Sequence, residues 1–422
     1  MSLFSAISAM IAIVALSGYA NRRFIRLPDT VGITAIALLI SLAMAVLGTT
    51  LPAVATWGRA AIGKLDFPVL IFHGLLGPLL FAGSLHVDIS ALARAKWVIL
   101  LLATIGVALS TALIAGAFFY GVRWLGADIP FIDCLVFGAL ISPTDPLAAL
   151  GLLRKAGVPP LLLTKITGEA LFNDGTGVVV FLVLVAIANG LQPLNAGSIL
   201  GLLAREVVGG IAFGLVIGFA GSWLLRSIDS PVVETLITLA MPTAGYAAAE
   251  AARVSAPLAA VVMGLVVGSY GRRYAVSAQT RAPLFLFWEL TDDLLNVLLY
   301  GLIGLELMAL DGLARDFIGP ALLATPIVLL ARVVSVGLPI AVLRRFERFE
   351  PHIVKLMTWA GLRGALSIAM ALSLSKSRSR EMIVAATYVV TLFSILIQAT
   401  TVEPLARRWA PRPDAEKQAL AR

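Results

Sequence analysis

Long apolar runs joined by short polar loops dominate the sequence. Thirteen apolar segments can be distinguished, and several reach the roughly 18–20 residues that an α-helix needs to cross a bilayer. They cover about residues 2–20, 30–48, 67–86, 97–121, 130–150, 165–189, 199–225, 232–251, 254–270, 283–309, 317–343, 353–374 and 382–404. The pattern predicts an all-α polytopic membrane protein with about thirteen transmembrane helices, forming a single membrane domain over residues 1–405.

The composition supports this class and narrows the chemistry. Of the 422 residues, 59% are hydrophobic and 13% are charged, whereas soluble domains carry about 25% charge. Cys134 is the only cysteine, which excludes an internal disulfide and a cysteine-built metal cluster. The sequence has no Gly-x-x-x-x-Gly-Lys-Ser/Thr loop, so we expect no bound nucleotide and no direct coupling to ATP. We also expect no other cofactor and no enzymatic activity.

The distribution of basic residues predicts the orientation. An odd number of spans places the two ends of the chain on opposite sides of the membrane. With the N-terminus outside, 21 of the 32 Lys and Arg residues lie on the cytoplasmic side, 9 lie outside and 2 lie within spans. Cytoplasmic loops carry the excess of Lys and Arg in membrane proteins. We therefore predict a plasma-membrane protein (inner membrane in a bacterium) with a short basic cytoplasmic tail over residues 406–422. The net charge of +8 then reflects topology, and we expect no nucleic-acid partner.

Thirteen segments divide into six, one and six, so the first and eighth would start on opposite faces of the membrane. This is the condition for two inverted six-helix repeats, a common plan in secondary transporters. The fifth segment is interrupted at Ser142-Pro143-Thr144-Asp145-Pro146, and its counterpart, the twelfth, at Gly361-Leu362-Arg363-Gly364. Interruptions at matching places in the two halves point to the ion site of such transporters.

The interruption in the fifth segment offers oxygen ligands. Each proline removes a backbone donor and disturbs the preceding turn, which frees carbonyl groups at a depth where they must line a cavity or meet a partner. These carbonyls and the Thr144 hydroxyl suit a monovalent cation such as Na⁺ or K⁺. Asp145 can bind the cation or offset the positive ends of half-helices. The alternative is a plain proline kink that Asp145 caps.

The sixth segment places Glu169 and Asp174 in apolar surroundings, about 140° apart around a helix. A carboxylate at this depth is costly and usually has a partner or a task. Removal from water favours the neutral form of a carboxylic acid, so protons and a cation can compete for Asp174. Asn173 is neutral, and one proton would then replace one monovalent cation. The alternative is a structural carboxylate tied to a neighbouring helix.

Two arginines lie within predicted spans, Arg332 in the eleventh segment and Arg363 in the twelfth. Arginine stays charged, so each needs a carboxylate or freed carbonyl groups. We favour a structural ion pair between Glu169 and Arg332, with Arg363 balancing the crossing of the interrupted helices. Glu169 as an ion ligand is the functional alternative.

Several of these motifs together resemble the monovalent cation:proton antiporter-1 family, the bacterial and archaeal Na⁺/H⁺ antiporters related to animal Na⁺/H⁺ exchangers. The resemblance extends from about residue 65 to 400. The motifs that carry it are Thr144-Asp145-Pro146, Gly168-Glu169-Ala170-Leu171-Phe172-Asn173-Asp174-Gly175, Ala331-Arg332, Gly361-Leu362-Arg363-Gly364-Ala365, Gly301-Leu302-Ile303-Gly304-Leu305-Glu306-Leu307 and the Ser255…Gly264-Leu265 stretch.

The resemblance implies a thirteen-helix antiporter fold. A core of about residues 97–189 and 317–404 would move against a scaffold of about 2–86 and 199–309, through which two copies would form a homodimer. Asp174 would carry the cation and the proton, Thr144 would contribute oxygen, Asn173 would support the site and Glu169 would pair with Arg332. The Asn-Asp pair resembles the electroneutral branch, which exchanges one cation for one proton in sodium transport and pH homeostasis.

Two positions depart from the family pattern. Relatives often have serine after the motif glutamate and glutamate after the Leu-Phe of the third segment, whereas this chain has Ala170 and Ala82. Two side-chain ligands of some relatives are therefore missing, so the preference among Na⁺, Li⁺ and K⁺ stays open.

Exchange of Na⁺ or Li⁺ for H⁺ is the leading hypothesis, and a K⁺-preferring cation/proton antiporter is the alternative within the same class. From other classes we weigh a cation channel, which would need a continuous pore, and an intramembrane aspartyl protease. Two interrupted helices around one carboxylate fit alternating access better than a pore. The Gly-x-Gly-Asp signature of the protease is absent, and Glu169, Arg332 and Arg363 would have no role in it.

Overall fold

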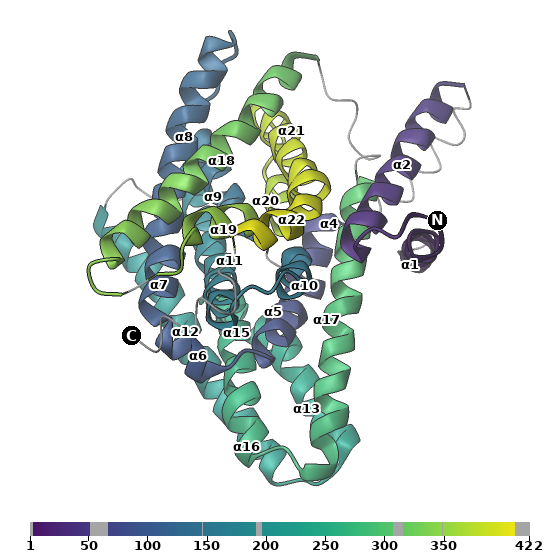
Figure 1. The fold of residues 1–422 in the computed structure, drawn as a ribbon, viewed down its shortest axis with the longest axis vertical. Coiled ribbons are helices and arrows are strands. Elements are labelled where there is room, and N and C mark those ends of the chain that lie inside the picture. Colours follow the sequence, from purple (N-terminus) through teal and green to yellow (C-terminus); the bar gives the residue numbers. More distant parts are fainter. Residues whose placement is uncertain are drawn as a thin grey trace. The chain divides into compact units, whose positions relative to one another are not determined.

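The structure is a computed structural model that describes residues 3–50, 66–145, 147–190, 196–306, 315–347 and 349–409. Helices are the only regular secondary structure within these ranges (Figure 1). The predicted all-α class is thereby confirmed. Its physical reason is that a helix satisfies its own backbone donors and acceptors, which lipid cannot do.

Each of the thirteen apolar segments coincides with one helix or with consecutive helices. The α-helices are α1 (Leu3–Ala20), α2 (Asp29–Thr50), α4 (Phe67–Val69), α5 (Leu76–Leu85), α6 (Ile89–Arg94), α7 (Lys96–Leu101), α8 (Val107–Trp124), α9 (Phe131–Ile141), α10 (Leu147–Lys155), α11 (Pro160–Ala188), α12 (Ala196–Arg226), α13 (Pro231–Ala240), α14 (Tyr246–Ala251), α15 (Ala256–Val266), α16 (Arg272–Tyr274), α17 (Ala278–Glu306), α18 (Arg315–Leu343), α19 (Ile353–Ala360), α20 (Ala365–Leu372), α21 (Arg378–Phe393) and α22 (Ala399–Trp409).

Short π-helical turns join several of these helices into continuous rods. They are η1 (Asn21–Ile25), η2 (Leu70–Leu75), η3 (Leu102–Gly106), η4 (Met241–Gly245), η5 (Val267–Gly271) and η7 (Ser394–Gln398). Such turns widen the helix by one residue and are frequent at functional sites.

Not every helix is long enough to span a membrane alone. In the described ranges, eight helices are long and apolar enough to cross, and the pair α19 and α20 makes up to nine if it is one broken span. Two further apolar helices are shorter, Asp29–Met44 and Phe131–Ile141. The chain is therefore an integral membrane protein by helix length and composition, while the count of thirteen spans and the inverted repeat stay predictions.

Both predicted helix interruptions are present. α9 ends at Ile141 and α10 begins at Leu147, so the Ser142-to-Asp145 stretch is non-helical; Pro146 lies outside the described residues. α19 ends at Ala360 and α20 begins at Ala365, so Gly361-to-Gly364 is non-helical too. Proline in one case and a pair of glycines in the other account for these breaks.

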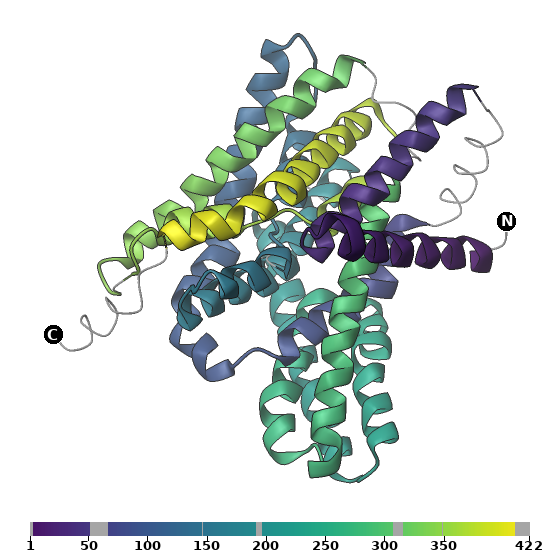
Figure 2. The same ribbon diagram turned by 45° about the vertical axis from the view of Figure 1, so that its right-hand side comes forward.

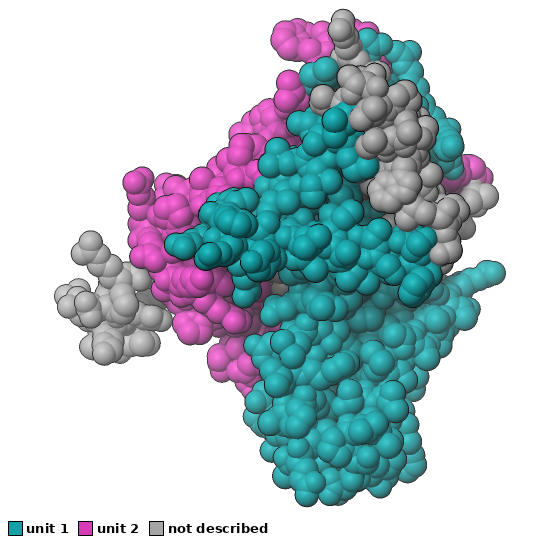
Figure 3. Space-filling model, turned by 90° about the vertical axis from the view of Figure 1, so that its right-hand side faces the viewer, with its two compact units in different colours: residues 1–86, 204–318, 365–385 teal, residues 87–203, 319–364, 386–422 magenta. Residues whose placement is uncertain are grey.

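The chain divides into two compact units (Figure 3). Unit 1 consists of residues 1–86, 204–318 and 365–385, and unit 2 of residues 87–203, 319–364 and 386–422. Most of the predicted core falls in unit 2, but residues 365–385 fall in unit 1. The assignment of a moving core and a fixed scaffold stays a prediction.

Small residues bring helices close together inside each unit. In unit 1, α17 packs along α2, and a Cβ added at Gly304 would lie 2.9 Å from the backbone of Thr34. In unit 2, α8 and α18 run side by side in both ribbon views (Figures 1 and 2), and Leu323 fills the space beside Gly121. Small residues at helix contacts are typical of membrane proteins.

The last described helix extends past the start of the predicted tail. α22 continues to Trp409, so the first four residues of the tail predicted over 406–422 are helical. Residues 410–422 lie outside the described residues.

Candidate ion-binding site

The two helix breaks are bonded directly to each other within unit 2. The backbone N–H of Asp145, in the first break, donates to the carbonyl oxygen of Leu362, in the second, over 2.9 Å. Non-helical backbone in a membrane needs such partners because each unsatisfied group costs several kcal/mol. A backbone carbonyl group of the second break therefore accepts a hydrogen bond from a backbone N–H of the first break.

Arg363 ties the same crossing through its side chain. Its Nη1 donates to the carbonyl oxygens of Ser142 and Pro143 at 2.5 and 2.7 Å. These are carbonyl groups that the proline-containing break leaves without a helical partner. Arg363 is buried, so its positive charge is placed against the negative ends of two backbone dipoles.

Asn173 fastens α11 to the first break. Its Nδ2 donates to the Thr144 Oγ1 at 2.8 Å, and its Oδ1 accepts from the Thr144 backbone N–H at 3.3 Å. Both residues are buried. The amide therefore holds the Thr144 hydroxyl oxygen in place without adding a charge to the site.

Asp174 follows directly on α11 and is half-buried. It lies within electrostatic range of Asp145, Arg363 and Glu169. Unlike the neighbouring charged side chains, its carboxylate makes no hydrogen bond or ion pair with any residue in the described part of the chain. It is thus a carboxylate with its binding capacity uncommitted.

Glu169 and Arg332 form a bidentate ion pair between α11 and α18. Arg332 Nη1 donates to Oε1 of Glu169 at 2.5 Å, and Nη2 donates to Oε2 at 2.8 Å. Arg332 Nη2 also reaches the Met357 carbonyl oxygen at 3.3 Å. Gly361 leaves room for this guanidinium, since a Cβ there would lie 2.8 Å from Arg332 Nε. Both oxygens of Glu169 are therefore occupied by Arg332.

Gly364 is needed for a second close approach. A Cβ at this position would lie 2.5 Å from Oδ2 of Asp145 and 2.9 Å from its Cβ. The half-buried Asp145 side chain therefore lies against the backbone of the second break. Together, the breaks and α11 bring Thr144, Asp145 and Asp174 into one region of unit 2.

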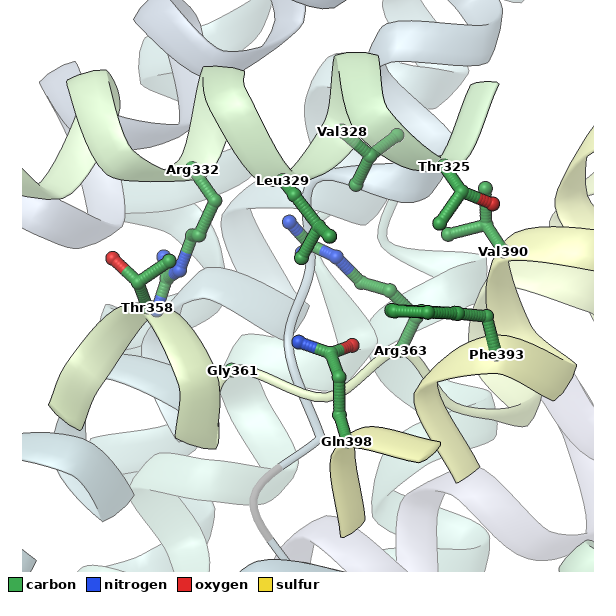
Figure 4. A pocket seen from close by; sticks show the side chains of 10 residues that line it. All are labelled: Thr325, Val328, Leu329, Arg332, Thr358, Gly361, Arg363, Val390, Phe393 and Gln398. Carbon is green, nitrogen blue, oxygen red and sulfur yellow. The ribbon is translucent and has the colours of Figure 1, made fainter. Parts of the chain in front are cut away.

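A small cavity of about 10 Å³ adjoins both arginines (Figure 4). Its walls come from α18, α19, the second break, α21 and η7. The lining residues are Thr325, Val328, Leu329, Arg332, Thr358, Gly361, Arg363, Val390, Phe393 and Gln398. Four of them carry a buried polar atom without a hydrogen-bond partner among the described residues, namely Thr325, Arg332, Thr358 and Gln398. The space matches what one water molecule needs.

The two positions that depart from the family pattern offer no ligand oxygen. Ala170 is buried in α11, directly after Glu169, and Ala82 is buried in α5 of unit 1. Among the described residues of this region, Thr144 and Asp174 are candidates to offer a side-chain oxygen to a cation, and Asp145 lies beside them.

Three buried polar residues with partners far away in the sequence or at the second break were not identified from the sequence. Ser394 and Gln398 reach the second break, as described below, and they are ordinary polar residues within an apolar run. Lys165, the first residue of the sixth apolar segment, is 1% exposed on α11. Its Nζ lies 3.4 Å from Glu350, 3.6 Å from Glu347 and 4.8 Å from the Phe349 ring centroid. Its partners are about 180 residues away in sequence, so no local pattern could reveal them.

A family model described as sodium/hydrogen exchanger, transmembrane, matches residues 11–408. The chain belongs to the sodium/hydrogen exchanger family. A Pseudomonas aeruginosa protein named Na⁺/H⁺ antiporter NhaP is 44% identical over 408 residues, covering 95% of this chain and 96% of the relative. Halobacillus dabanensis Na⁺/H⁺ antiporter NhaH is 30% identical over 401 residues, covering 94% and 95%.

A solved structure has the same fold as this exchanger-family chain. It is the sodium proton antiporter MjNhaP1 from Methanocaldococcus jannaschii at pH 8, with a TM-score of 0.77 over 97% of this chain and 99% of that one. At 19% identity, the likeness supports the fold. The predicted antiporter fold and the resemblance to this family are confirmed, and the family consists of transporters rather than enzymes.

Proposed function

We propose that this member of the sodium/hydrogen exchanger family exchanges Na⁺ for H⁺ across the membrane, with Asp174 as the carboxylate that binds either ion. The observation that carries the proposal is the difference between Asp174 and its neighbours. Glu169, Arg332 and Arg363 all have protein partners, while the Asp174 carboxylate has none among the described residues. An exchange site needs one such uncommitted group.

Competition for one carboxylate is sufficient for exchange. Desolvation favours the neutral acid, so a proton binds when the cation leaves. Asp174 would contribute the charge, and Thr144 and Asp145 can add oxygen ligands, which hard cations prefer. Asn173 stays neutral in both states. One Na⁺ would then leave for each H⁺ that binds, with no net charge moved.

The interrupted helices make alternating access possible. Arg363 and the Asp145–Leu362 hydrogen bond hold the two breaks together, so the site can move as one body while the path to it opens on one side at a time. We expect the core helices to move against the scaffold helices of a homodimer, with the N-terminus outside and the C-terminus in the cytoplasm.

The ions proposed are Na⁺ and, secondarily, Li⁺. Relatives at 44% and 30% identity are named Na⁺/H⁺ antiporters, and these names do not support the K⁺ alternative, a channel or a protease. The losses at Ala170 and Ala82 remain a reason to measure ion preference directly.

The test is transport in proteoliposomes with an internal pH dye and an imposed pH gradient. Na⁺, Li⁺, K⁺ or choline is added in turn to wild type, to Asp174→Asn and to Asp133→Asn, a control carboxylate in the first turn of α9. We expect Na⁺ and Li⁺ to dissipate the gradient in wild type and in the control but not in Asp174→Asn. In wild type, the apparent KM for Na⁺ should rise as pH falls, approaching about tenfold per pH unit under simple competition.

Two results would overturn the proposal. If adding Na⁺ or Li⁺ to wild-type vesicles left the imposed pH gradient unchanged at every tested pH, Na⁺/H⁺ exchange would be refuted. Normal exchange in Asp174→Asn would leave the antiporter class intact and remove the central residue from its mechanism.

A further inference from the structure

The π-helical turn η7 reaches the second helix break from the α21–α22 rod. Ser394 Oγ accepts a hydrogen bond from the backbone N–H of Arg363 at 2.8 Å. The same hydroxyl donates to Oε1 of Gln398 at 2.7 Å. Ser394 and Gln398 are both buried. The contact therefore lies inside unit 2, out of reach of bulk water.

The usual partner of a helical serine is different. Serine and threonine hydroxyls in helices commonly donate to the carbonyl oxygen four residues earlier. Thr400 follows this habit two residues after η7, since its Oγ1 donates to the Leu396 carbonyl oxygen at 2.9 Å. Ser394 instead gives its proton to the Gln398 side chain, which leaves its oxygen lone pair aimed at Arg363.

This orientation matters because the break removes helical partners from backbone groups. A buried N–H without a partner is rare and costly in native structures. Ser394 supplies the partner for Arg363, whose guanidinium in turn holds the Ser142 and Pro143 carbonyl oxygens. Pro143 is followed directly by Thr144. A series of hydrogen bonds thus links Gln398, Ser394 and Arg363 to the Pro143 carbonyl oxygen, one residue before Thr144.

The amide orientation of Gln398 follows from the same contacts. Its Oε1 is taken by Ser394, and its Nε2 is buried without a partner among the described residues. Gln398 lines the small cavity with Arg332 and Arg363 (Figure 4). The Gln398 side chain therefore lies at the same cavity as both buried arginines.

We propose that Ser394 and Gln398 are positioning residues for the cation site. Gln398 orients the Ser394 hydroxyl, and Ser394 holds the backbone N–H of Arg363 in the break. The Arg363 side chain in turn fixes the carbonyl groups that precede Thr144. The inference rests on the proposed Na⁺/H⁺ exchange and adds the residues that hold the second helix break in position. Neither residue contacts the transported ion.

Proteoliposome transport of the full chain provides the test, with apparent Na⁺ KM and turnover measured separately over a pH series. The variants are Ser394→Ala, Gln398→Met, the double variant, Ser394→Thr, and the control Thr400→Val. Outer partners of ion ligands typically change affinity or activity by 10–100-fold, so we expect each single loss variant to raise KM about tenfold while turnover changes little. Either substitution interrupts the same series of hydrogen bonds. The KM of the double variant should therefore be no higher than that of Ser394→Ala.

Rescue and control separate positioning from general damage. Ser394→Thr retains the hydroxyl and should keep a KM close to that of wild type. Thr400→Val should do the same, because the wild-type Thr400 hydroxyl bonds only within its own helix. If Ser394→Ala fails to assemble, Gln398→Met decides, since it leaves the Arg363–Ser394 contact possible.

Different outcomes would overturn different claims. Wild-type vesicles that do not exchange Na⁺ for H⁺ would refute the proposed function itself. Normal exchange in wild type together with an unchanged KM in both loss variants would refute the positioning role alone. If the KM increases of the two single variants multiply in the double variant, Ser394 and Gln398 act separately. That result would also contradict the proposed series of hydrogen bonds.

Discussion

Replacing Arg332 by leucine tests how much the buried ion pair contributes to stability. The change removes both donors from Glu169, which is 1% exposed. Deleting one partner of a buried pair costs about 3–5 kcal/mol, because the remaining charge is left uncompensated. With an unfolding entropy of about 2 cal/mol/K per residue over 422 residues, we expect the melting temperature to fall by about 3–6 °C.

The double variant Glu169→Leu/Arg332→Leu makes the prediction sharper. Replacing a whole buried pair by apolar residues of similar volume is often neutral or stabilising. We therefore expect the double variant to melt above Arg332→Leu. A matched control is Arg378→Leu, which removes an exposed pair with Asp316 at 3.9 Å and should leave the melting temperature unchanged.

Tryptophan fluorescence of the purified protein in detergent, recorded at one scan rate, gives these melting temperatures. The scan rate must be shared because large proteins often unfold irreversibly. The view that Glu169 and Arg332 compensate each other in the buried core would be refuted if Arg332→Leu melted at the wild-type temperature, or if the double variant melted below Arg332→Leu.

Two further predictions address the site and the orientation. Gly364→Ala should lower Na⁺ affinity in the vesicle assay and cost about 1–3 kcal/mol of stability, because the added methyl group would lie 2.5 Å from Oδ2 of Asp145; wild-type transport in this variant would contradict the close approach. Ser377 is exposed, and Ser377→Cys should react with an impermeant maleimide added outside intact cells, while the buried native Cys134 should not; labelling only after the cytoplasm is opened would reverse the predicted topology.

The sequence by itself determined the class of the protein and the places where its helices break. Both follow from local chemistry. Apolar segments must become helices in lipid, which leaves backbone groups no other partner. Pro143, with its missing N–H, and the glycines at 361 and 364 favour helix breaks, although prolines also lie inside α17, α18 and α22 without ending them. The acid and amide at Asp174 and Asn173 stood out for the same reason, since charge in apolar surroundings is costly.

Tertiary structure decided which of these groups meet. The sequence offered two arginines for Glu169 and favoured Arg332, and the fold places Arg332 against its carboxylate, 163 positions away. It also places Arg363 on carbonyl groups 220 and 221 positions earlier. Periodicity has no information at such separations, because contacts between helices depend on how the rods pack rather than on spacing within them.

The fold also changed the meaning of residues that looked ordinary. Lys165, at the edge of an apolar segment, is a buried cation with two acidic neighbours. Ser394 and Gln398 resembled scattered polar residues in an apolar run, yet they meet the backbone of the second break. A hydrogen bond needs a donor and an acceptor within about 3 Å, and only the packed helices bring these particular atoms so close.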